Sequence, residues 1–138
     1  MNVFIAAKYE TRIDLWPVRA VIHGLGHRVV SSWLDEATPR GGSTPEDEWK
    51  AGIRDRNDIR RSDLFILDTT APSETGGREV ELGFALAQAK VVWHVGPNRN
   101  IYHQSVTMAF DSWIQALGYL AYFRVPSGAG SGGAPSNG

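Results

Sequence analysis

The sequence predicts a three-layer α/β sandwich built on a doubly wound parallel sheet of four or five strands, flavodoxin-like or Rossmann-like. Short apolar runs alternate with segments of helical periodicity along the chain. Such alternation favours parallel strands joined by right-handed helical crossovers, with helices on both faces of the sheet. A flavodoxin-like strand order is expected. The 138 residues correspond to one domain.

The first third of the chain contains two predicted strands and one predicted helix. Residues 3–7 form an apolar run typical of a buried strand. Residues 11–25 have helical spacing that ends at Gly26, and Pro17 is a candidate for the first residue of the helix proper. Residues 27–33 read as a second strand.

The middle of the chain begins with a loop rich in proline and glycine at residues 35–45. Thr44 is a predicted N-cap, because a proline and acidic residues follow it, and the helix runs to about Arg61. A third strand covers residues 63–67 and ends at Asp68.

The last part of the domain begins with a helix over residues 78–89, followed by a strand over residues 91–95. A short strand and a helix are expected between residues 105 and 123. We expect the domain to span residues 1–124. Residues 125–138 are expected to form a disordered Gly/Ser-rich tail, because almost no apolar side chain there offsets the entropy of ordering.

Composition excludes several classes of function. Lys and Arg number 14 and Asp and Glu 15, so a binder of nucleic acid or of an anionic membrane is disfavoured. Cysteine is absent, which excludes thiol catalysis, disulfides and Cys-ligated metals. The four histidines lack metal-site spacing, and neither GxGxxG nor a P-loop occurs. No signal peptide or membrane span is evident, so we expect a cytoplasmic protein without metal or organic cofactor.

Ligands of such sheets bind beyond the carboxyl ends of the strands, which predicts where a site should lie. Four segments are candidates on this ground, and they are Ala6–Tyr9, Ser31–Trp33, Asp68–Gly77 and Val95–Tyr102.

Glu81 is the most informative carboxylate near these strand ends. Gly76 and Gly77 let the backbone approach a ligand, and the helix that follows carries Glu81 in or just beyond its first turn. The helix dipole favours the ionised form, which suits a nucleophile or an electrostatic stabiliser. Apolar neighbours predict that Glu81 is half-buried, whereas Glu79 should take the exposed side and Val80 should not.

Four short segments carry a resemblance to a known family. They are Phe4–Tyr9, Asn57–Ile59 with Ser62–Asp68, Gly77–Ala85, and Lys90–Val92 with Val95–Pro97. In order and spacing, over roughly residues 2–120, the chain resembles the nucleoside 2-deoxyribosyltransferase family. That family includes the deoxynucleoside 5′-monophosphate N-glycosidases and nucleotide hydrolases acting on CMP-type substrates.

The resemblance implies roles for three residues. Glu81, within Val80–Gly83, matches the nucleophile that attacks C1′ of the sugar. Asp58 matches the aspartate beside the sugar and base, and Tyr9 matches the aromatic residue that stacks on the base. Phe4 stands where many members have a tyrosine that orients the glutamate, so the glutamate must be positioned differently here.

The resemblance also implies a substrate with a 5′-phosphate. Thr75 stands where the enzymes of free nucleosides have an aspartate, and a hydroxyl donates to a phosphate that a carboxylate would repel. Ser105 matches a serine supplied by a neighbouring subunit, which implies a homodimer or higher oligomer. The remaining residues expected to bind substrate are Ala6, Asp68, Ser73, Gly76, Gly77 and Arg78.

These observations favour cleavage of the N-glycosidic bond of a nucleoside 5′-monophosphate, with water as acceptor. One alternative is base exchange through the same glycosyl-enzyme. The cytokinin-activating phosphoribohydrolases are a weaker match, because their Gly-rich pattern is only partly present at Gly76, Gly77 and Glu81. A non-catalytic nucleotide-binding module on the same fold is the alternative from another class.

Overall fold

Five parallel strands form one sheet at the centre of the domain, in the order β2-β1-β3-β4-β5. This is the flavodoxin-like order expected from the sequence, which is confirmed. The computed structural model describes residues 1–36 and 44–124. The predicted tail, and most of the loop predicted at residues 35–45, lie outside the described residues. The strands are β1 Asn2–Ala6, β2 Arg28–Val29, β3 Leu64–Asp68, β4 Val91–Val95 and β5 Met108–Phe110.

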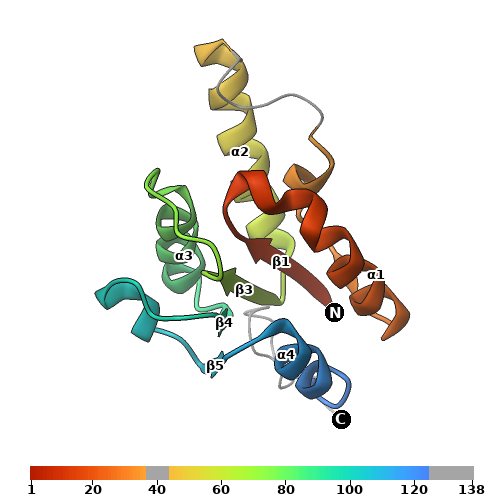
Figure 1. Ribbon diagram of the computed structural model, residues 1–138. Helices are drawn as coiled ribbons and strands as arrows, with labels where there is room; N and C mark the ends of the chain where they lie inside the picture. Colours follow the sequence, from red (N-terminus) through yellow and green to blue (C-terminus); the bar gives the residue numbers. More distant parts are fainter. Residues whose placement is uncertain (37–43, 125–138) are drawn as a thin grey trace, which may run out of the picture.

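Helices cover both faces of this sheet, as a doubly wound fold requires (Figure 1). Helix α1 (Trp16–Gly24) packs with α4 (Trp113–Leu120) on one face. Helix α2 (Pro45–Arg61) packs with α3 (Gly77–Ala87) on the other. None of these helices, within the described part of the chain, is long and apolar enough to cross a membrane.

The core lies around β1 and β3, the central strands of the sheet. All five residues of β3 are buried, as the continuous apolar run predicts for a strand covered on both faces. The rings of Phe4 and Phe65 stack across the β1–β3 pair, with centroids 5.5 Å apart. Phe4 is fully buried there, so it packs the sheet and presents no polar group to a ligand.

Local sequence signals located the helix α2 correctly. Thr44 is its N-cap and forms a capping box with Asp47, in which each side chain accepts a hydrogen bond from the other residue's backbone N–H. The helix ends at Arg61, as predicted. Pro17 likewise lies in the first turn of α1.

Two predicted elements differ from the structure. The helix predicted over residues 11–25 is a 3₁₀ helix, η1 (Tyr9–Leu15), followed by α1. The strand predicted over residues 27–33 shrinks to the two residues of β2, and a 3₁₀ helix, η2 (Ser32–Asp35), follows it. The reason lies in distant partners, because Trp33 Nε1 donates to the carbonyl oxygen of Ile5 at 2.7 Å. This bond ties the side chain of Trp33 to the backbone of β1.

The carboxyl ends of β1 and β3 meet at one edge of the sheet. Ala6 pairs with Leu67, and Asp68 pairs with Val95 of β4. Consequently η1, which follows β1, lies near the loop of residues 69–76, which joins β3 to α3. This edge is where the fold predicts a ligand site.

Candidate active site

A pocket of about 950 Å³ opens at this edge of the sheet. One wall is the end of β1 with η1, and the other is the loop 69–76 with the start of α3. It brings together six of the residues proposed from the sequence to act in catalysis or binding, namely Tyr9, Ser73, Thr75, Gly77, Arg78 and Glu81. The lining residues are Ala7, Lys8, Tyr9, Glu10, Arg12, Pro72, Ser73, Glu74, Thr75, Gly77, Arg78 and Glu81.

Glu81 reaches the pocket from the second turn of α3. Gly76 precedes that helix in a left-handed conformation (φ +75°), which an L side chain rarely adopts. Glu81 is half-buried, as predicted, and its Oε2 atom is shielded from solvent. A half-buried carboxylate facing a cavity has the placement that a nucleophile requires.

The exposed side of this helix was predicted wrongly. Val80 is 74% exposed, although it was expected to help exclude solvent. Glu79 is instead mostly buried, with a side chain 19% exposed. The predictions for Val80 and Glu79 failed together because Glu79 turns toward His103, a partner 24 residues further along the chain.

Glu79 joins α3 to the short 3₁₀ helix η4 (Ile101–Gln104). Its Oε1 atom accepts hydrogen bonds from His103 Nε2 at 2.9 Å and from Arg78 Nε at 3.2 Å. Burial by itself would raise the pKa of Glu79, but these two hydrogen bonds, a backbone hydrogen bond and the charge of Arg78 together outweigh it and hold the pKa below its usual value. Glu79 is therefore an ionised structural residue, committed to this contact.

The position of the ring proton of His103 follows from its second hydrogen-bond partner. The backbone N–H of Arg99 donates to His103 Nδ1 at 3.0 Å, so the ring proton of the neutral side chain lies on Nε2, toward Glu79. His103 is fully buried. The contact fixes the loop after β4 against the start of α3.

His94 is a buried core histidine in β4, hydrogen-bonded through one of its two ring nitrogens. Its Nε2 atom hydrogen-bonds to Thr69 Oγ1 at 2.6 Å, and the residue is 1% exposed. Burial, reinforced by the nearby His103 and Arg78, lowers the pKa of His94. His94 is therefore neutral at physiological pH. Among residues 1–36 and 44–124, no cluster of His, Cys, Asp or Glu suits a metal ion.

Tyr9 is the aromatic residue of the pocket. It begins η1, directly beyond the end of β1, and it is half-buried. The guanidinium carbon of Arg12 lies 4.7 Å from the centroid of the Tyr9 ring, over its face. The ring of Trp33 lies 6.3 Å from it at a tilt of 39°. A base that stacks on Tyr9 therefore uses the face away from Arg12 or displaces the guanidinium.

Trp33 ends the second of the strand-end segments singled out in the sequence, but it is only 3% exposed and does not line the cavity.

The loop 69–76 is shaped by Asp68 and Arg78. Asp68 Oδ1 accepts from the backbone N–H and the hydroxyl of Thr70, at 2.8 and 2.6 Å, and Oδ2 accepts from Trp113 Nε1 at 2.8 Å. Arg78 Nη1 donates to the carbonyl oxygens of Ala71, at 2.7 Å, and Asp68, at 3.3 Å. Asp68 does not line the pocket, so it shapes the loop from beneath.

The pocket face of this loop carries small hydrogen-bonding groups. The hydroxyls of Ser73 and Thr75 lie 3.2 Å apart, and both residues line the cavity. A Cβ atom built on Gly77 would meet no atom within 4 Å, so the backbone there faces open space. Two hydroxyls beside an uncovered stretch of backbone at a helix start suit an anionic ligand group.

Asp58 does not line this pocket. It is 2% exposed, and its carboxylate accepts from the backbone N–H of Ser32 at 3.0 Å and from Arg61 Nη2. Both partners line a different pocket of about 310 Å³. Asp55, one turn earlier on α2, is also buried at 5% exposure.

Three other candidate residues also lie outside the lining of the pocket. Ala6 is fully buried in β1, and Gly76 contributes the backbone turn before α3. Ser105 is exposed at the end of η4, next to the exposed side chains of Ile101 and Tyr102. The pocket thus draws on two of the four strand-end segments singled out in the sequence, the first and the third.

The pocket also contains residues that sequence reasoning missed. Glu10 and Arg12 lie just beyond the segment Ala6–Tyr9 singled out at the end of β1, and Lys8 lies within that segment but was given no role. Pro72 and Glu74 were passed over in favour of the hydroxyl residues beside them.

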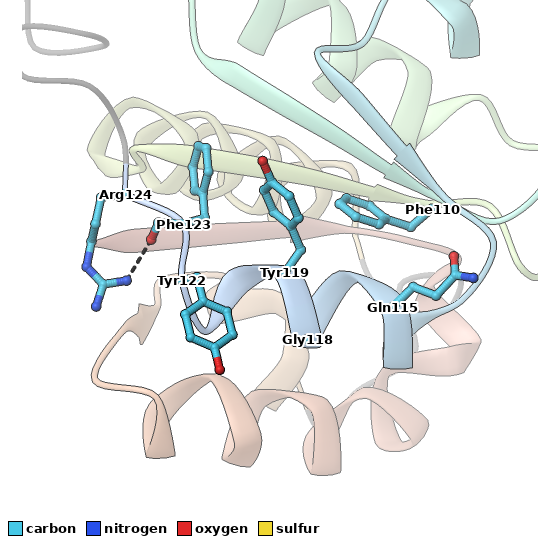
Figure 2. A pocket seen from close by; sticks show the side chains of 7 residues that line it. All are labelled: Phe110, Gln115, Gly118, Tyr119, Tyr122, Phe123 and Arg124. Carbon is cyan, nitrogen blue, oxygen red and sulfur yellow. Dashed lines mark hydrogen bonds between the residues drawn. The ribbon is translucent and has the colours of Figure 1, made fainter.

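A second cavity, of about 690 Å³, lies beside α4 (Figure 2). The rings of Phe110, Tyr119 and Phe123 lie on the sheet side of that helix, and Tyr122 points away from them. Its lining contains no Asp, Glu or His residue. The cavity that holds Glu81 is therefore the candidate active site.

Solved structures share this fold. A 2-deoxyribosyltransferase from the psychrotolerant bacterium Bacillus psychrosaccharolyticus matches with a TM-score of 0.72 and 19% identity, over 86% of this chain and 92% of that one. The chain has the deoxyribosyltransferase fold. The Clostridium botulinum CMP N-glycosidase BcmB matches with a TM-score of 0.56 and 20% identity, over 89% of this chain and 100% of that one. No family model and no curated protein matches the chain.

A conserved protein from Enterococcus faecalis V583 shares the fold as well, with a TM-score of 0.65 and 13% identity over 87% of this chain and 96% of that one. Two of these three proteins are enzymes, a 2-deoxyribosyltransferase and a CMP N-glycosidase. The likeness that the sequence predicts is thus confirmed for the fold.

Proposed function

We propose that the protein cleaves the N-glycosidic bond of a nucleoside or deoxynucleoside 5′-monophosphate and releases the base. The observation that carries this proposal is that Glu81 and Tyr9, from α3 and from the end of β1, line one pocket. A carboxylate and an aromatic ring at one cavity are what attack on a sugar beneath a stacked base requires. The fold shared with a CMP N-glycosidase and a 2-deoxyribosyltransferase supports it.

In the first step, a Glu81 carboxylate oxygen bonds to C1′ as the C1′–N bond breaks. The electron pair of that bond leaves with the base, which takes up a proton. In the second step, water attacks C1′ and gives up a proton to solvent, which balances the proton that the base takes up from solvent. The bond to Glu81 breaks, and the carboxylate is restored.

The loop 69–76 is the proposed phosphate side of the site. Ser73 and Thr75 supply hydroxyl donors, and the backbone at Gly77 is uncovered. Asp68 and Arg78 contribute by holding the loop in this shape. Ala6 and Gly76 contribute by placing the backbone that follows them.

Base exchange is the second candidate, because one protein with this fold is a 2-deoxyribosyltransferase. It uses the same glycosyl-enzyme and lets a second base attack in place of water. Product analysis with and without an acceptor base separates the two reactions.

The proposal is tested by replacing Glu81. Incubation with a panel of nucleosides and their monophosphates, followed by chromatography of the released base, should show turnover by the wild type. Glu81→Ala should lower base release at least about a thousandfold, because the covalent step is lost. Nucleotide binding, measured by calorimetry, should stay within about tenfold, since the other contacts remain.

Glu48→Gln is the matched control, because Glu48 is exposed on the first turn of α2, outside the pocket. It should turn over substrate like the wild type. Near-normal turnover by Glu81→Ala would overturn the mechanism, and binding without turnover by the wild type would indicate a non-catalytic nucleotide-binding module.

A further inference from the structure

Three cationic side chains line the candidate active site, and two of them are engaged with protein groups. Arg12 donates from Nε to the carbonyl oxygen of Glu36 at 2.9 Å and lies over the ring of Tyr9. Arg78 is 4% exposed, and it bonds to two carbonyl oxygens and to Glu79. Both guanidinium groups therefore serve to hold the walls of the pocket.

Lys8 is the third cation, and its situation differs. Within the part of the chain that the structure describes, no hydrogen bond or ion pair involves its ammonium group. Its backbone, by contrast, is fixed, because its carbonyl oxygen accepts from the N–H of Thr11 at 2.9 Å and from the Thr11 hydroxyl at 2.6 Å. Lys8 is thus half-buried, and its side chain extends from a backbone held by these two hydrogen bonds.

The opposite wall carries the hydroxyls of Ser73 and Thr75 and the uncovered backbone of Gly77. These groups donate hydrogen bonds without supplying a full positive charge. A phosphate held there would still need a positive charge nearby, because the hydroxyls orient the phosphate but do not neutralise it. A lysine ammonium can supply that charge.

The remaining charges of the pocket make that counter-charge necessary. Glu10, Glu74 and Glu81 also line the cavity, so three carboxylates face any anion that enters. Arg78 is buried and Arg12 is held over Tyr9, so Lys8 is, among the described cations of the pocket, the one whose charged group has no protein partner and can turn toward an anion.

We propose that Lys8 binds the 5′-phosphate of the substrate and thereby makes the enzyme select nucleoside monophosphates over nucleosides that lack the phosphate. This inference rests on the proposed function, because it names the residue that recognises one group of that substrate. In this proposal Arg78 is a positioning residue, because it holds the loop 69–76 through the carbonyl oxygens of Asp68 and Ala71.

The test compares Lys8→Gln with the wild type on a nucleoside 5′-monophosphate and on the nucleoside with the same base. Losing a charge-assisted hydrogen bond should raise KM for the monophosphate about ten- to a hundredfold. Kinetics on the nucleoside should stay within about twofold. Lys8→Arg should recover most of the loss, because it keeps the charge. A general effect on folding would instead change both substrates alike.

Lys50→Gln is the matched control, because Lys50 is an exposed lysine of α2 that pairs with Glu46 at 3.2 Å. It should match the wild type on both substrates. Calorimetric binding of the monophosphate to wild type and Lys8→Gln gives a readout that needs no turnover. If the wild type binds the monophosphate without releasing base, the proposed function fails, while tenfold weaker binding by Lys8→Gln still supports the role of Lys8.

Three outcomes would overturn the role of Lys8. One is an unchanged affinity of Lys8→Gln for the monophosphate, and another is an equal loss on both substrates. The third is absence of monophosphate binding by the wild type, which would overturn the proposed function as well.

Discussion

Two glutamates two positions apart on α3 illustrate how environment assigns roles. Glu79 accepts hydrogen bonds from His103 and Arg78, so its carboxylate is committed to the link between α3 and η4. Glu81 projects into the large pocket opposite Tyr9. A helix turns by about 100° per residue, so two residues two apart face different sides. Both residues are glutamates, so the surroundings of each side chain decide whether it binds another part of the protein or faces the cavity.

Asp58 provides a prediction at this scale. Its carboxylate caps Ser32 N–H and pairs with Arg61, outside the pocket of Glu81. Asp58→Asn should lower the free energy of unfolding by about 1–3 kcal/mol, because an amide cannot satisfy both donors equally. The kcat of the folded protein should change less than tenfold. Urea denaturation and initial rates measure the two effects separately.

Asp55→Asn is the natural comparison, because Asp55 is a buried carboxylate one turn earlier on the same helix. A hundredfold loss of kcat in Asp58→Asn with stability unchanged would show that Asp58 acts directly on the substrate, as the family resemblance implies.

At the scale of elements, the loop 69–76 is held from several sides. Beneath it are Asp68 and Arg78, and Arg99 donates from Nε to the carbonyl oxygen of Thr69 at 2.7 Å. The loop therefore presents its hydroxyls in a preset arrangement, which lowers the entropy lost when a ligand binds.

Gly96, at the end of β4, touches the same loop and offers a test of this arrangement. It has φ +107°, and a Cβ atom there would come 2.8 Å from the backbone nitrogen of Thr70. Gly96→Ala should cost roughly 1–3 kcal/mol of stability and displace the start of the loop. Weaker binding of the monophosphate should accompany the lower melting temperature.

Gly52→Ala, in the middle of α2, is the control, since its Cβ atom would meet nothing within 4 Å. It should stabilise the protein by about 0.5–1 kcal/mol. A Gly96→Ala protein as stable as the wild type, with binding intact, would contradict the view of the loop as preset.

At the scale of the whole molecule, we propose a homodimer or larger assembly in which Ser105 completes the site of a neighbouring subunit. Ser105 is exposed, and Ile101 and Tyr102 beside it are 75% and 61% exposed. Apolar side chains at such exposure, next to the edge of the sheet that carries the pocket, suit a contact between subunits.

Mixing two inactive variants tests this assembly. Glu81→Ala and Ser105→Ala subunits should each be impaired as pure proteins. After unfolding and refolding together, each mixed dimer should regain one intact site, so activity should reach about a quarter of the wild-type value. Sedimentation measures the assembly state. Activity that stays at the mean of the two pure variants would rule out a shared site.

The sequence by itself determined the class of fold, the strand order, the helix α2 with its Thr44 cap and the half-buried state of Glu81. These features depend on apolar periodicity and on capping residues within a few positions, which a chain displays locally. Only the tertiary structure decided the burial of Glu79, the shortening of β2 and the placement of Asp58. Each of these depends on a partner from a distant segment, and no local pattern encodes such contacts.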